Sequence, residues 1–180
     1  MLRPLTLMLV ALAAAAPAAF AADPPSTAAA TLAQAPSTDE FLSKLAPGNR
    51  FEIDSSKLAL DKSKSEMVKA FASEMTKDHG QAAIKMKQAV TDAKLKAPSD
   101  QLDAKQQQVY DDLKKKEGAA FDQAYVDAQL QGHVDAVAMV EAYAKGGDNP
   151  RIKAFASDIL PTLKTHLGHV KKLQASIGKS

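Results

Sequence analysis

Four histidines are the residues of this 180-residue chain whose type and spacing best suit metal chemistry. His79, His133 and His166 each lie three or four residues from apolar neighbours, which places them on the buried faces of helices. His169 follows one helical turn after His166, and we expect it near the surface. Neutral imidazole is the commonest metal ligand in proteins, so the pattern predicts a site for zinc, copper or iron.

Glu52 is the carboxylate that we expect to join these histidines. An α-helix rises about 1.5 Å per residue, so in an up-down bundle Glu52, His79, His133 and His166 lie within about two helical turns of one level. Three neutral imidazoles and one carboxylate can hold a single divalent transition-metal ion. The sequence therefore predicts a mononuclear metal site formed by these four residues.

The same residues permit an interpretation without metal. A histidine on an apolar helix face commonly bonds to a backbone carbonyl or a carboxylate, and Glu52 or Asp78 could serve here. The chain would then be a non-catalytic structural or protein-interaction module of the envelope, with another protein or a cell-wall component as its partner. A redox enzyme is the weakest hypothesis, because no second catalytic group accompanies the histidines. Both non-enzymatic hypotheses remain open at this point.

Apolar residues at steps of three and four predict the helices that must position these side chains. Four long helices are expected at about 38–62, 65–94, 119–145 and 150–176, with a short helix at about 103–116 in the link between the second and third. Pro47 should break or kink the first helix, and Pro161 should kink the last. The expected fold is all-α, an antiparallel four-helix bundle.

The first 21 residues have the features of a secretory signal peptide. Arg3 supplies a positive start, an apolar run too short for a stable membrane anchor follows, and Ala19-Phe20-Ala21 fits a cleavage site. We expect a signal peptide at 1–21, a flexible leader rich in Ala, Pro, Ser and Thr at 22–37, and the bundle at 38–177. The chain would thus be periplasmic or otherwise exported, with no membrane span after cleavage.

Composition excludes several other classes of function. The chain has 23 Lys and Arg against 21 Asp and Glu, so no strong charge points to nucleic acid. It contains no Cys, which rules out thiolate chemistry, disulfides and attachment of a lipid to a processed N-terminal cysteine. No Gly-rich phosphate loop and no G-x-S-x-G nucleophile turn occur. The sequence does not specify an oligomeric state.

Spaced motifs give the chain a family resemblance. They are FA-x-x-M-x-x-DH at 71–79, FD-x-x-Y with a following His at 121–133, and FA-x-x-x-LP-x-L-x-x-HL at 155–167. Together with NRFEIDSSKLAL around Glu52, these motifs resemble the DUF4142 family over about 39–173. The resemblance implies an exported protein with a ferritin-like four-helix bundle.

The resemblance does not imply ferritin chemistry. Di-iron proteins of the ferritin type carry Glu-x-x-His on two helices, with one further Glu on each of the other two. In this chain Thr76, Leu130 and Leu163 stand three residues before the histidines of the apolar stripes. Because the bridging carboxylates are absent, a di-iron centre is not expected, and one ion with histidine ligands agrees better with the sequence.

Overall fold

The computed structural model describes residues 35–177, which form five α-helices and no strand. The helices are α1 (Thr38–Lys62), α2 (Glu66–Asp92), α3 (Ala104–Lys115), α4 (Gly118–Gly146) and α5 (Pro150–Ile177). The expected signal peptide at 1–21, and the expected leader as far as residue 34, lie outside the described residues. None of these five helices has the length and apolar character needed to cross a membrane.

Polar side chains determine where the helices begin. The Ser37 hydroxyl caps α1 by accepting from the Glu40 backbone N–H. Ser65 caps α2 in the same way. Asp103 forms a capping box with Gln106 at the start of α3.

The two later helices begin at residues with special backbone conformations, a proline and a glycine. Pro150 is the first residue of α5, and the Asn149 side chain accepts from the Ile152 backbone N–H. Gly118 opens α4 with a φ of +55°, a left-handed conformation that a side chain would disfavour. These two sites separate α3 from α4 and α4 from α5.

The expected break at Pro47 is wrong, because α1 continues through it. Proline removes one backbone donor and crowds the preceding turn, which ordinarily disfavours a helix interior. Here Leu45, Ala46 and Pro47 are all buried, as is Phe51 one turn later. Packing of both halves of the helix against their neighbours outweighs the single lost hydrogen bond.

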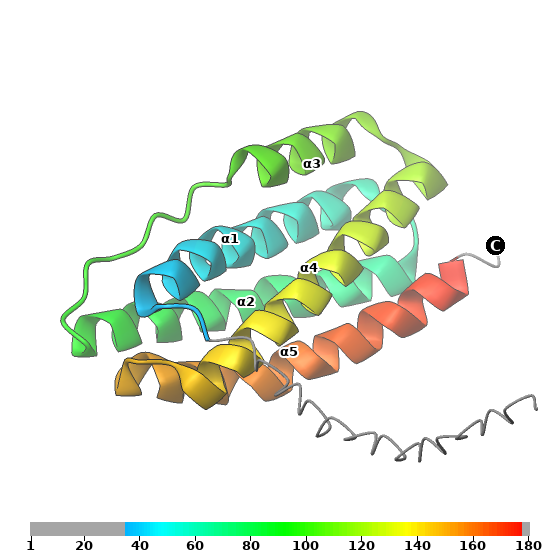
Figure 1. Ribbon diagram of the computed structural model, residues 1–180. Coiled ribbons are helices and arrows are strands. Elements are labelled where there is room, and N and C mark those ends of the chain that lie inside the picture. Colours follow the sequence, from blue (N-terminus) through cyan, green and yellow to red (C-terminus); the bar gives the residue numbers. More distant parts are fainter. Residues whose placement is uncertain (1–34, 178–180) are drawn as a thin grey trace, which may run out of the picture. The chain divides into compact units, whose positions relative to one another are not determined.

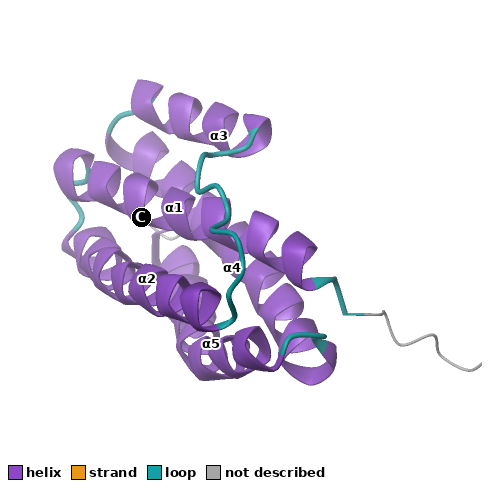
Figure 2. Cartoon of the chain, turned by 90° about the vertical axis from the view of Figure 1, so that its left-hand side faces the viewer, coloured by secondary structure: helices purple, strands orange, loops and turns teal. Residues whose placement is uncertain are grey.

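The helices pack in a closed set of contacts. α1 lies against α2 and α4, and α5 also lies against α2 and α4 (Figure 1). The short helix α3 packs on α1 and α4, on the side of α1 away from α2 (Figures 1 and 2). The link between α2 and α3 therefore crosses α1, and α3 covers one side of the helical bundle.

The buried core divides into two apolar clusters. One is centred on Phe71, Phe121 and Tyr125, and the other on Phe41 and Tyr143. Each of the four long helices also buries polar groups near the place where the two clusters meet. These are Glu52, Ser55 and Ser56 on α1, His79 on α2, Gln129 and His133 on α4, and His166 on α5. A polar level thus crosses the middle of the core.

Candidate metal centre

Three imidazole rings meet within the polar level. His79, His133 and His166 come from α2, α4 and α5, and their ring centroids lie 5.4–5.5 Å apart in every pair. The rings are almost fully buried, with exposed fractions of 5%, 1% and 1%. The structure therefore brings together three of the four residues predicted as ligands, on three separate helices. The fourth, Glu52, lies beside them on α1.

Each ring uses one nitrogen in a hydrogen bond to an acceptor oxygen. His79 Nδ1 donates to Asn49 Oδ1 at 2.9 Å, and His133 Nδ1 donates to the Gln129 carbonyl at 2.9 Å. His166 Nε2 donates to Asp78 Oδ2 at 3.1 Å. Because an oxygen acceptor requires a proton on the nitrogen that faces it, these contacts specify the tautomer of each ring. The opposite nitrogen of each neutral ring then carries a lone pair.

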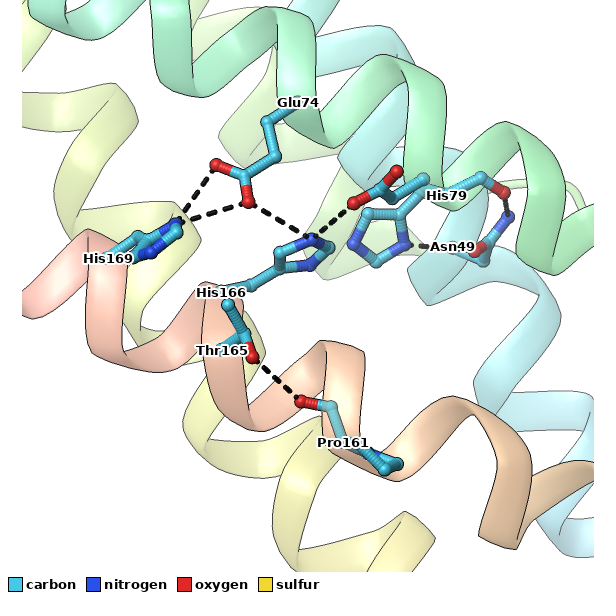
Figure 3. A network of polar contacts seen from close by, with 8 residues as sticks. Asn49, Glu74, His79, Pro161, Thr165, His166 and His169 are labelled. Carbon is cyan, nitrogen blue, oxygen red and sulfur yellow. Dashed lines mark hydrogen bonds and ion pairs between the residues drawn. The ribbon is translucent and has the colours of Figure 1, made fainter.

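The three opposite nitrogens converge. His79 Nε2, His133 Nε2 and His166 Nδ1 are buried and have no hydrogen-bond partner within residues 35–177. One ring nitrogen from each histidine lies within 4.8 Å of those of the other two. Figure 3 shows the unpaired sides of His79 and His166 facing each other. A buried acceptor without a partner costs about 1–3 kcal/mol, so this arrangement calls for a shared partner such as a metal ion.

Burial keeps the His79 and His133 rings neutral. It lowers the pKa of His79 well below its ordinary value, and the neighbouring His133 and His166 lower it further. Burial likewise lowers the pKa of His133 to about 4, against the opposing effect of its bond to the Gln129 carbonyl. A neutral imidazole is the form that donates a lone pair to a metal. These two rings are thus ready to bind a cation at neutral pH without first losing a proton.

Glu52 approaches His133 at the nitrogen that is not free. Its Oε1 is 3.9 Å from His133 Nδ1, the nitrogen already bonded to the Gln129 carbonyl, and its Oε2 has no partner among the described residues. Glu52 is not part of the group of donor atoms that lie within 4.8 Å of one another. Burial raises its pKa to about 8, so the side chain is protonated at neutral pH.

A cavity of about 520 Å³ borders the cluster. All four predicted residues line it, together with apolar side chains of α2, α4 and α5 such as Met86, Met139 and Ile159. This volume is many times that of a metal ion, so water or a small molecule can reach the imidazoles from within the cavity. Exposed residues such as Lys44 and Gln131 also line this cavity, so it connects the buried rings with solvent.

Three supporting residues were not found by sequence reasoning. Asn49 fixes the tautomer of His79, and its amide Nδ2 also donates to the His79 backbone carbonyl at 3.1 Å. Gly132 provides the space in which the Glu52 carboxylate lies. Gln129 donates to Ser55 Oγ at 3.0 Å. Asn49 lies one helical turn before Glu52, and this spacing was the one available signal, because it puts both on one face of the helix.

The expectation for His169 is confirmed. Its side chain is 46% exposed, and its Nδ1 donates to the Glu74 carboxylate at 3.0 Å. It lies on α5 one turn beyond His166, as Figure 3 shows. His169 is therefore separate from the three converging rings.

Fold and site together define an all-α protein with a buried cluster of three histidines in its core. The chain belongs to the family described as Domain of unknown function (DUF4142), whose model matches residues 22–173. No curated protein matches the sequence. A similar solved structure is CopM in the Cu(II)-bound form, at 16% identity and a TM-score of 0.66, covering 79% of this chain and 98% of that chain. That likeness establishes a shared fold.

Proposed function

We propose that this protein is an exported metal-binding protein that holds one transition-metal ion with His79, His133 and His166. The observation that carries the proposal is the convergence of three buried ring nitrogens that lack hydrogen-bond partners in the described residues. A core built only for stability would satisfy these nitrogens or replace them with apolar groups. Three unsatisfied acceptors aimed at one point are better explained by a ligand that all three bind.

Outer hydrogen bonds support the same function. Each ring donates its other N–H to an amide, carbonyl or carboxylate oxygen, which holds the ring in place and makes the free nitrogen more basic. This arrangement is frequent around metal-binding histidines. The support comes from Asn49, Gln129 and Asp78, one for each ring.

Copper is the first ion to test. Among zinc, copper and iron, Cu(II) binds nitrogen donors most tightly, and imidazole suits both copper and zinc. The similarly folded CopM has been solved in a Cu(II)-bound form, which supports the same choice for this chain. A di-iron centre is disfavoured, because Thr76, Leu130 and Leu163 stand where a Glu-x-x-His motif would place its glutamate.

Glu52 is proposed as the carboxylate that responds to the bound ion. A cation at the three imidazoles would stabilise the ionised form of Glu52 and lower its raised pKa. The resulting negative charge would partly compensate the charge of the ion in the buried site. Glu52 would thus act as a fourth ligand, or as a neighbouring counter-charge for the same ion.

The finer architecture and the location are part of the proposal. The pairing of α1 with α2 and α4, and of α5 with α2 and α4, supports an antiparallel ferritin-like bundle of four long helices, with α3 in the second link. The apolar N-terminal run before Ala19-Phe20-Ala21 supports export through a signal peptide at 1–21. The mature protein would then encounter metal ions in the cell envelope.

Metal content of exported protein tests the proposal. The full chain is expressed with its own leader and no polyhistidine tag, purified from the envelope fraction, and titrated with Cu(II) after chelation. One tightly bound ion per chain is expected, together with a raised melting temperature. His133→Ala should abolish binding, and His79→Leu provides a second variant of the cluster.

Tyr143→Phe is the matched control, because it removes a buried hydroxyl far along the core from the histidines. It should bind one ion as the unaltered protein does. A chain that binds no Cu(II) and no Zn(II), or a His133→Ala variant with unchanged affinity, would overturn the proposal. The protein would then be better described as a structural or interaction module of the envelope.

A further inference from the structure

A second cluster of metal-binding side chains lies on the outer side of His166. Glu74 and Asp78 are one helical turn apart on α2, and His166 and His169 are three residues apart on α5. His169 Nδ1 lies 3.0 Å from Glu74 Oε2, and His166 Nε2 lies 3.1 Å from Asp78 Oδ2 and 3.9 Å from Glu74 Oε1. Figure 3 shows Glu74 positioned between the two imidazoles. The four residues are called the outer cluster below.

The two carboxylates of the outer cluster have no Lys or Arg partner within residues 35–177. The ion pairs found for Glu74 and Asp78 are with His166 and His169. Elsewhere on the surface, carboxylates such as Asp158 and Glu117 pair with lysines. Glu74 and Asp78 are about one-third exposed, at 32% and 30%. They are thus reachable by a hydrated cation and are not paired with a lysine or an arginine.

His166 belongs to both clusters. Its Nε2 faces Asp78 and Glu74 of the outer cluster, whereas its buried Nδ1 is the unpaired nitrogen beside His79 and His133. One imidazole ring therefore separates a partly exposed carboxylate site from a buried imidazole site. Asp78 also lines the cavity together with His79 and His166, so one carboxylate of the outer cluster borders the space beside the inner one.

We propose that Glu74, Asp78 and His169 form an outer site that captures a divalent transition-metal ion and passes it to the three buried histidines. This inference rests on the proposed function of the inner cluster. A hydrated ion loses its water reluctantly, and the three buried histidines have no carboxylate among their converging donor atoms. Two carboxylates at the entrance attract the ion and replace part of its hydration shell before it moves inward.

The outer site should control the rate of loading and not the final affinity. A group that acts only on the route lowers the barrier for entry and release by the same amount, so the dissociation constant stays unchanged. Glu74 and His169 suit the test better than Asp78, because Asp78 accepts the Nε2–H of His166 directly. A substitution of Asp78 would therefore also alter His166, which is a ligand of the inner site.

The experiment compares Cu(II) loading of full-length mature protein with the variants Glu74→Gln, His169→Gln and the double variant. Loading is followed by stopped-flow quenching of tyrosine fluorescence, release by transfer to a chelator, and affinity by competition titration. In the double variant the rates of loading and release should both fall, by roughly tenfold, with the dissociation constant unchanged. The loading rate of the unaltered protein should also fall more steeply with ionic strength than that of the double variant.

Glu117→Gln is the control for charge, because it removes one exposed carboxylate that pairs with Lys62. It should load at the rate of the unaltered protein. Unchanged loading in the double variant would overturn the outer site, and so would weaker affinity at an unchanged loading rate. Either result still requires Cu(II) bound by the unaltered protein, whereas absence of binding there would instead overturn the proposed function together with this inference.

Discussion

The backbone of Gly132 on α4 lies against the Glu52 carboxylate of α1. A Cβ atom at position 132 would lie 2.6 Å from Glu52 Oε1, closer than any ordinary contact. The glycine thus provides the space in which a buried carboxyl group can lie beside His133. Glycine inside a helix costs about 1 kcal/mol relative to alanine. At position 132 this loss of helix stability accompanies the space that Glu52 occupies.

Gly132→Ala should therefore displace Glu52 while leaving the fold intact. The carboxylate is the far end of a flexible side chain and can move away, and alanine favours the helix. We expect a free energy of unfolding within about 1 kcal/mol of the unaltered protein, together with an affinity for Cu(II) weakened by about tenfold. Urea unfolding and competition titration measure the two effects.

The double variant Gly132→Ala, Glu52→Gln supplies the check. If the glycine acts through Glu52, the second substitution should add little to the loss of affinity caused by the first. Additive losses would mean that Gly132 affects the site by another route. A loss of several kcal/mol of stability in Gly132→Ala would mean that the helix, and not only the side chain, had moved.

The metal-free protein should be most stable near pH 6.5. The raised pKa of Glu52, about 8 against an ordinary 4.5, makes stability fall as pH rises from 4.5 to about 8. The lowered pKa of His133, about 4 against 6.5, makes stability fall as pH drops from 6.5 toward 4, and His79 shifts in the same direction. Above pH 6.5 the two histidines no longer change the stability, so only Glu52 makes it fall as pH rises.

Urea unfolding of the metal-free protein at pH 6.5 and pH 8 measures this effect. The expected loss between them is about 2 kcal/mol, since one group contributes about 1.4 kcal/mol per pH unit within its window. Glu52→Gln, which cannot ionise, should remove the loss. An equal loss in the variant and the unaltered protein would show that Glu52 is not the titrating group.

Asn49→Ala should weaken metal binding without removing the site. Asn49 holds His79 by accepting its Nδ1–H and by donating to its backbone carbonyl. Without that partner the ring can rotate or change tautomer, and loss of such a supporting group typically costs 10- to 100-fold in affinity. Cu(II) titration should still give one ion per chain. An unchanged dissociation constant would mean that His79 is positioned by packing alone.

Tyr143→Phe should destabilise the protein at a point remote from the metal centre. The Tyr143 hydroxyl contacts Thr38 Oγ1 at 2.5 Å and Asp148 Oδ1 at 3.1 Å, so it ties the start of α1 to the turn between α4 and α5. Loss of these hydrogen bonds should cost about 1–2 kcal/mol in the free energy of unfolding. The affinity for Cu(II) measured in parallel should not change. A changed affinity would couple this end of the core to the histidines.

Much of the helical fold was predictable because local signals agreed with one another. Periodic apolar residues and polar caps place the helix starts and ends within a few residues, and Pro150 opens α5 as expected. Pro47 is the exception. Its local signal favours a break, but burial of the turns on both sides favours a continuous helix, and burial is a tertiary effect.

The sequence by itself determined that three histidines on three helices share one level, because the rise per residue and the helix ends are local properties. Only the tertiary structure decided which nitrogen of each ring is free, since this depends on Asn49, the Gln129 carbonyl and Asp78 as partners. It also decided that Glu52 is buried beside Gly132 and that Glu74 meets His169. Those contacts arise from the rotation of each helix about its axis, which packing sets and periodicity leaves undetermined.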